Sequence, residues 1–147
     1  MLSLARPVAS VAQKPDSARA RLLAGCWSIT VGPFKATTKT GIDSGMTNLP
    51  ARVRLDTVPG VGLFGEPRDW LLRAIPDTHA SRYGDGLFFP TGRDKVRLMW
   101  SNGFVALSID ATVKGDEMRG TATAGTDYGG EKQAAITLQR IICPPAA

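Results

Sequence analysis

The chain has 147 residues, of which 43% are hydrophobic and 21% charged, and its net charge is +5. This length and composition are those of one ordinary globular domain and exclude an intrinsically disordered chain. No apolar run approaches the roughly 18 residues that a membrane-spanning helix needs, so no transmembrane segment is expected. The lysines and arginines are scattered, whereas a nucleic-acid interface gathers them on one face, so no specific nucleic-acid partner is expected.

The first part of the chain predicts a leader and then a short helix. Residues 1–15 are small, polar and interrupted by prolines, which is typical of a flexible leader and unlike a signal peptide. Residues 16–147 are expected to form a single domain. Asp16 and Ser17 offer N-cap oxygens to a helix over 18–24, and Gly25 ends it.

From Gly25 onward, apolar and polar residues alternate with period two, which predicts β-strands. Sixteen glycines and ten prolines punctuate these runs, so the strands are expected to be short and joined by turns. Long loops are expected over 35–50 and 76–86, and Pro59-Gly60 is expected to end the second strand. Asn102-Gly103 is a strong signal for a type I′ hairpin. The eight predicted strands are 25–31, 52–58, 69–75, 87–89, 95–101, 104–113, 117–126 and 132–142.

Eight sequential strands without long helices between them predict an all-β fold, an antiparallel up-and-down barrel preceded by the short helix. A two-sheet sandwich is the alternative, but the hairpin series lacks obvious crossovers between sheets. In a closed barrel the first strand pairs antiparallel with the last. That pairing places Cys26 near Cys143 and Trp27 near Arg140. The two cysteines are therefore expected to form a disulfide, and two unpaired thiols are the alternative.

Gly25-Cys26-Trp27, which opens the first strand after a short helix, resembles the Gly-x-Trp signature of the lipocalin and calycin family. In that family an arginine near the end of the last strand packs over the tryptophan, and Arg140 lies at the matching place. Two features depart from the family. Thr126-Asp127-Tyr128 has the letters of a second family motif but lies before the last strand, and no long helix follows that strand. The resemblance implies a small, bacterial lipocalin-like barrel in which Trp27 and Arg140 are structural.

Inward-facing apolar side chains are the strongest candidates for a binding site. Small residues on the late strands (Gly120, Ala122, Ala124 and Ala134) favour some unfilled space, although a fully packed core has the same alternation. The inward set is expected to include Ile29, Val31, Val53, Leu55 and Ile136. The residues predicted to line a ligand pocket are Leu72, Phe89, Leu98, Trp100, Leu107 and Met118.

Catalytic and metal-binding signals are weak. The single histidine, His79, lies near Tyr83 in a polar loop, and a general base needs a partner and a reachable substrate. No nucleophile elbow or phosphate loop occurs, and zinc would need more His or Cys ligands. The sequence therefore predicts no catalytic residue, no metal and no cofactor.

The sequence thus predicts a barrel that binds a small hydrophobic or amphipathic molecule. One alternative is a barrel enzyme, an isomerase or cyclase for an apolar substrate, with His79, Tyr83 or Arg73 projecting inward. Another is a solid-core interaction module. The expected disulfide places the protein in the periplasm or outside the cell.

Overall fold

The structure is a computed structural model that describes residues 17–37, 47, 49–61, 67–76, 86–101, 105–126 and 129–145, with only the backbone described at 17, 57–61 and 67–76. The predicted leader, His79 and Tyr83 lie outside the described residues. The elements in chain order are α1 (Ser17–Leu23), β1 (Gly25–Val31), β2 (Lys35–Ala36), β3 (Arg52–Val61), β4 (Pro67–Pro76), β5 (Gly86–Gly92), β6 (Lys95–Ser101), β7 (Val105–Lys114), β8 (Glu117–Thr126) and β9 (Glu131–Ile141).

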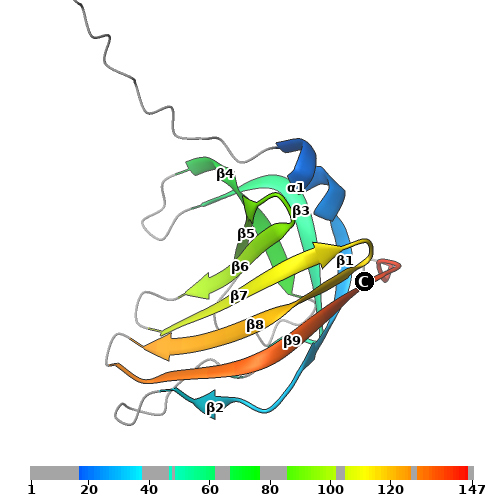
Figure 1. Ribbon diagram of the computed structural model, residues 1–147. Coiled ribbons are helices and arrows are strands. Elements are labelled where there is room, and N and C mark those ends of the chain that lie inside the picture. Colours follow the sequence, from blue (N-terminus) through cyan, green and yellow to red (C-terminus); the bar gives the residue numbers. More distant parts are fainter. Residues whose placement is uncertain are drawn as a thin grey trace, which may run out of the picture.

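All the strands belong to one antiparallel sheet that closes on itself (Figure 1). From β3 to β9 each strand pairs with the next in the chain, and β1 pairs with both β3 and β9. Eight strands make this ring, and the short β2 only lengthens its β1–β9 side. The predicted up-and-down barrel with a short N-terminal helix is confirmed, and the sandwich alternative is wrong. The described part of the chain contains no helix with the length and apolar character needed to cross a bilayer.

The strand β2 lies inside the segment that the sequence predicts to be loop. After β1, the amide of Gly32 donates to the carbonyl of Ala135 across a 2.9 Å hydrogen bond, and Lys35 then pairs with Gln133. The chain from β1 to β2 therefore follows β9 along nearly its whole length. Two residues are too few for alternation to reveal such a strand.

The sequence also places several strand ends too early. Strand β3 runs through Pro59-Gly60, which were expected to stop it, because two register shifts absorb these residues in the β3–β4 ladder. Strand β5 includes Pro90, which pairs with Val96 on β6, while the β4–β5 ladder ends at Phe88. A proline has no amide to donate, so it is tolerated where one neighbour has diverged.

One end of the barrel, which we call the α1 end, is covered by the helix. Ala20 and Leu23 pack into the core from α1, which lies against β3 and β5. The indole Nε1 of Trp27 donates to the carbonyl oxygen of Leu23 at 3.0 Å, and the Trp27 side chain is fully buried. This hydrogen bond therefore links the helix to the first strand at the α1 end of the barrel.

Arg140, on the last strand, also contacts the junction between α1 and β1. Its guanidinium carbon lies 4.4 Å from the centre of the Trp27 ring, in cation–π geometry. Its two terminal nitrogens donate to the carbonyls of Leu22 and Ala24, at 2.6 and 2.8 Å, and its Nε donates to Asp116 at 2.9 Å. These carbonyls at the end of α1 have no partner within the helix, so Arg140 acts as its C-terminal cap.

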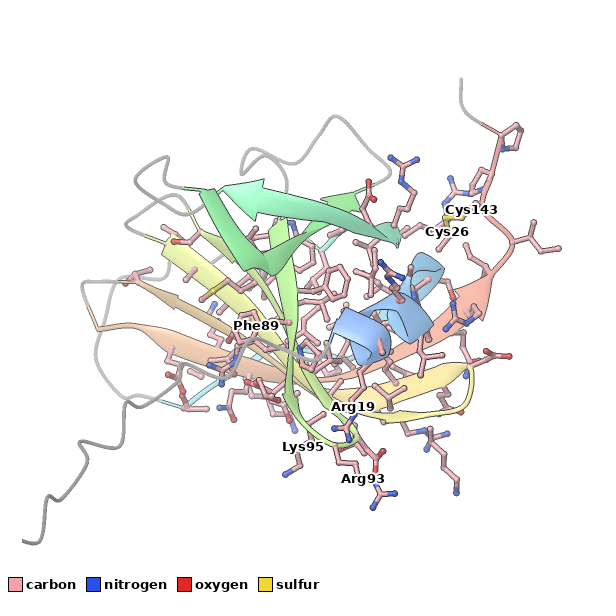
Figure 2. The ribbon with its side chains drawn as sticks, turned by 90° about the horizontal axis from the view of Figure 1, so that it is seen from above. Arg19, Cys26, Phe89, Arg93, Lys95 and Cys143 are labelled. Carbon is pink, nitrogen blue, oxygen red and sulfur yellow. A yellow bond between two sulfur atoms is a disulfide. The ribbon has the colours of Figure 1, made fainter. Side chains whose placement is uncertain are left out.

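A disulfide joins Cys26 on β1 to Cys143, just after β9, as the barrel topology predicts (Figure 2). The two Cα atoms are 5.1 Å apart and 117 residues apart in sequence. The bridge therefore closes almost the entire domain into one covalent loop.

At Gly120 the backbones of β8 and β7 approach each other closely. A Cβ added at this position would lie 1.8 Å from the backbone oxygen of Asp110 on β7 and 2.7 Å from the Cα of Ala111. Any side chain there would push β8 away from β7. A glycine at such a point lets a barrel strand bend sharply while its ladder continues.

We predict that replacing both cysteines, as Cys26→Ser with Cys143→Ser, lowers the free energy of unfolding by about 4 kcal/mol, since so long a loop is no longer closed in the unfolded chain. Urea denaturation followed by circular dichroism measures this change. Reductant should destabilise the natural chain similarly and leave the double variant unaffected. Equal stability of the two proteins would contradict the prediction.

We predict that Arg140→Met lowers the free energy of unfolding by about 2 kcal/mol, because two helix-end carbonyls lose their donors. Arg97→Met is the matched control. Arg97 forms an ion pair with Asp110 at 2.7 Å, but both side chains are nearly half exposed, so the expected loss is below about 1 kcal/mol. Similar losses in the two variants would show that Arg140 is an ordinary surface cation.

We predict that Gly120→Ala destabilises the barrel by about 2 kcal/mol, since the added methyl meets backbone that cannot move aside alone. Gly125→Ala, on the same strand, is the control. Its new Cβ would have its nearest neighbour at 3.7 Å, an ordinary contact. Thermal unfolding of both variants tests this, and an unchanged melting temperature for Gly120→Ala would refute the close approach.

Candidate functional site

The barrel interior is lined by apolar side chains that recur at every second position. On β6, Val96, Leu98 and Trp100 are buried and alternate with partly exposed neighbours. On β7, Leu107, Ile109 and Ala111 do the same. Among the described residues no polar or charged residue is buried, so the interior suits an apolar molecule or the apolar part of one.

Part of the inward face of β8 and β9 is made of small side chains, although Met118, Ile136 and Leu138 on the same strands are bulky and buried. Ala122 and Ala124 on β8 are buried, as is Ala134, which pairs with Ala122 from β9. We call these three residues the alanine wall. In the ladder, Ala122 lies opposite Ile109 and Ala124 opposite Leu107. Because alanine ends at Cβ, this wall is recessed relative to the strands beside it.

The position of the Trp100 side chain depends on the absence of a side chain at Gly86. A Cβ built on Gly86 would lie 2.5 Å from the Trp100 indole, so the ring lies directly against the β5 backbone. Trp100 pairs with Leu107, which in turn pairs with Ala124, so the indole and the leucine share one row of the sheet with Ala124 of the alanine wall. Sequence reasoning did not single out Gly86, since a glycine opening a strand gives no sign of which side chain covers it.

The structure brings some of the predicted lining residues together. Leu98, Trp100 and Leu107 lie close to one another on β6 and β7 and are buried. Met118 is also buried, but it pairs with Val113 and Leu138, nearer the α1 end. The pocket role of these residues stays a prediction.

The expectation that Phe89 faces the interior is wrong. Phe88 is fully buried in the core, whereas Phe89 lies on the other face of β5 and is partly exposed (Figure 2). Leu72 pairs with Phe88 through the backbone, but its side chain is outside the described atoms. Phe88 therefore takes the place of Phe89 in the candidate site.

Catalytic chemistry receives no support from the described residues. Of the candidates for an inward polar group, Arg73 is described only by its backbone pairing with Leu87, and His79 and Tyr83 lie outside the described ranges. In those ranges no group of three or more His, Cys, Asp or Glu residues is placed to hold a metal ion.

The carboxyl of Glu117 has a lowered pKa, mainly because the Arg119 side chain donates a hydrogen bond to it. A lowered pKa keeps this carboxylate ionised, whereas a carboxyl that exchanges protons near neutral pH has a raised one. The pair lies at the start of β8, outside the apolar lining, where it contributes charge to the surface.

Comparison of the chain with protein-family models, with curated proteins and with solved structures finds no match. Functional inference therefore depends on the barrel itself and on the residues that line it.

Proposed function

We propose that this protein binds a small hydrophobic or amphipathic molecule inside a lipocalin-like barrel. The observation that carries the proposal is the pairing of bulky inward side chains on β6 and β7 with the recessed alanine wall on β8 and β9. A barrel of eight strands has an interior wide enough for one small ligand when some of its side chains are small. In this proposal the alanine wall leaves the space that the ligand fills.

The arrangement at the α1 end supports the family relationship. A Gly-x-Trp opening, a helix packed beneath it and an arginine stacked on the tryptophan occur together here, at Gly25, Trp27 and Arg140. Because this end is closed by α1, the ligand would enter from the opposite end, where β6 and β8 end. Trp100 and Leu107 lie toward that opposite end of their strands.

Affinity would come mainly from removal of apolar surface from water. A ligand that buries roughly 400 Å² of apolar area gains about 10 kcal/mol, from which the costs of association and ordering are subtracted. The interior offers no buried charge among its described residues, so the ligand's polar group would stay at the open end.

The disulfide supports a location in the periplasm or outside the cell, since such bonds persist in oxidising compartments. In this proposal residues 16–147 are the single binding domain and residues 1–15 are a leader outside it.

We predict that the neutral dye N-phenyl-1-naphthylamine binds with an increase in fluorescence, and that Ala124→Leu weakens binding at least tenfold, since the larger side chain fills the space before the alanine wall. Thr123→Leu is the matched control, because Thr123 is the next residue on β8 and faces outward. Its dissociation constant should stay within twofold of that of the natural chain.

Circular dichroism first establishes that both variants keep the barrel. Absence of dye binding to the natural chain would instead favour a solid-core interaction module, and equal weakening by the two variants would place the site elsewhere. Native mass spectrometry of protein purified from its source would then identify the natural ligand by its mass.

A further inference from the structure

A hollow of about 310 Å³ lies on the outer face of the barrel, over β6, β7 and β8. This volume is at the lower end of the range of small-molecule sites. Its lining includes Lys95, Asp110, Thr112, Arg119 and Gly120, and none of the residues that we assign to the barrel site. The two sites are therefore distinct, and we call this one the outer hollow.

Three neighbouring strands place a hydroxyl between two cations in the outer hollow. Lys95 on β6 pairs with Thr112 on β7, which pairs in turn with Arg119 on β8. All three residues are exposed, and each is adjacent in its strand to a buried residue, so their side chains share the outer face. Neighbouring strands lie about 4.8 Å apart, so both long side chains can reach a small group held over Thr112.

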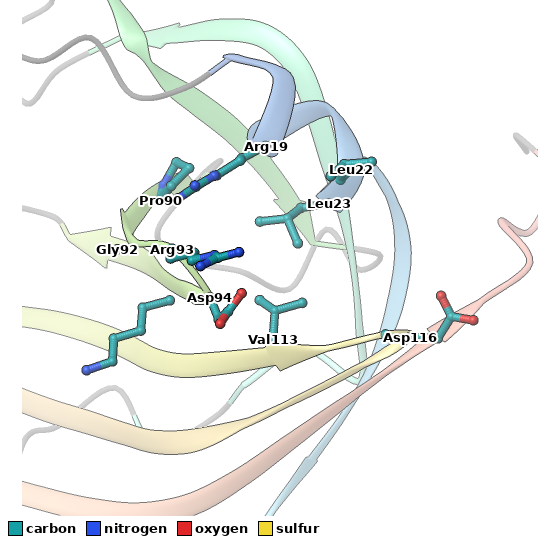
Figure 3. A pocket seen from close by; sticks show the side chains of 11 residues that line it. Arg19, Leu22, Leu23, Pro90, Gly92, Arg93, Asp94, Val113 and Asp116 are labelled. Carbon is teal, nitrogen blue, oxygen red and sulfur yellow. The ribbon is translucent and has the colours of Figure 1, made fainter.

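The charge of Lys95 is not neutralised within the described part of the chain. Lys95 lies on the outside of the barrel (Figure 2) and forms no ion pair with a described residue. The preceding residue, Asp94, lines a separate cleft of about 380 Å³ between α1, the β5–β6 turn and the β7–β8 turn (Figure 3). Lys95 borders both concavities, but Asp94 is not part of the lining of the outer hollow.

Arg119 keeps donors available although it is already paired. Its Nε donates to the carboxylate of Glu117, two residues earlier on β8, while the Arg119 side chain remains 77% exposed. A guanidinium has five N–H donors. Its side chain makes no second hydrogen bond to a described residue, so the two terminal nitrogens can still donate to a ligand.

The carboxylate of Asp110 also lines the outer hollow, but it is paired. It accepts a hydrogen bond from the Nε of Arg97 at 2.7 Å, and this ion pair offsets its charge. The described charged residues on the outer face of β6, β7 and β8 are four cations and two carboxylates: Lys95, Arg97, Lys114 and Arg119, with Asp110 and Glu117. An excess of two positive charges is complementary to a dianion.

The backbone beneath the outer hollow is fixed before a ligand binds. Strand β7 is paired with β6 on one side and with β8 on the other at Thr112. At Gly120, which also lines the hollow, the backbones of β7 and β8 approach each other closely. The side chains of Lys95 and Arg119 are therefore the main groups that a ligand has to order.

We propose that the outer hollow binds the phosphate group of a small phosphate monoester. Lys95, the hydroxyl of Thr112 and the terminal nitrogens of Arg119 donate hydrogen bonds to the three terminal oxygens of the phosphate. Its two negative charges match the excess of positive charge on this face, and the organic part extends into solvent. This proposal does not depend on ligand binding inside the barrel.

The test is a ¹⁵N NMR titration of the full chain with methyl phosphate, at low salt and at pH 8. A phosphate monoester is a dianion at this pH, because its second pKa is about 6. We expect saturable amide shifts that concentrate at Thr112, Arg119 and Gly120. The dissociation constant should be about 1 mM, since exposed ion pairs are weak, and should rise as salt is added.

Two pairs of variants test the donors. Lys95→Gln with Arg119→Gln should weaken binding at least tenfold. Its control, Lys35→Gln with Arg54→Gln, removes the same charge from exposed residues on β2 and β3 and should leave the dissociation constant within twofold. Thr112→Val keeps the shape of the side chain and removes only the hydroxyl, and it should weaken binding at least threefold.

Thr121→Val is the control for the hydroxyl, because Thr121 is exposed on β8 and does not line the hollow. It should leave binding within twofold. Circular dichroism first establishes that each variant keeps the barrel. Equal weakening by a variant and its control, or amide shifts that concentrate on the inward residues of the barrel, would overturn the proposal.

A comparison of probes identifies the chemical group. Methyl phosphate should bind at least as tightly as inorganic phosphate, and tighter binding of inorganic phosphate would assign the hollow to the free ion instead. Dimethyl phosphate, which has one charge and two terminal oxygens, should bind at least fivefold more weakly than methyl phosphate. Binding of the diester as tightly as the monoester would overturn the proposal in favour of a phosphodiester, such as a nucleic-acid backbone.

Discussion

The guanidinium of Arg140 is the point on which the closed end of this barrel depends. It stacks on Trp27 of the first strand, caps the carbonyls at the end of α1 and binds Asp116 in the β7–β8 turn. The first two elements of the chain, α1 and β1, therefore converge with the β7–β8 turn and β9 on one side chain. A flat group with five donors can serve them together, whereas the single ammonium of a lysine cannot match this geometry.

This convergence sets the α1 end apart from the interior of the barrel. At the α1 end, buried aromatic and aliphatic side chains are overlaid by charged turns, and the concavity there has a mixed apolar and cationic character. Within the ring, the described lining is apolar throughout, and its shape varies because alanines on β8 and β9 face larger residues on β6 and β7.

The sequence alone predicts the ring because alternation, turn residues and the positions of the two cysteines all agree with one topology. It fails at Phe88 and Phe89, since three consecutive apolar residues in β5 have no alternation, and the pairing of Phe88 with Leu98 decides which one is buried. Pro59-Gly60 has the sequence pattern of a strand end, although the β3–β4 ladder continues through these residues with register shifts. The packing of α1 against β3 and β5 is invisible in the sequence, because these elements meet only when the barrel closes.

The bridge between Cys26 and Cys143 has a topological consequence. Because these Cα atoms are only 5.1 Å apart, the first and last strands of the ring lie close enough to be joined by a peptide. A circularly permuted gene could join the end of β9 to the start of α1 through a peptide linker and open the chain at another turn. The linker would then hold the two ends of the barrel together, as the disulfide does in the natural chain.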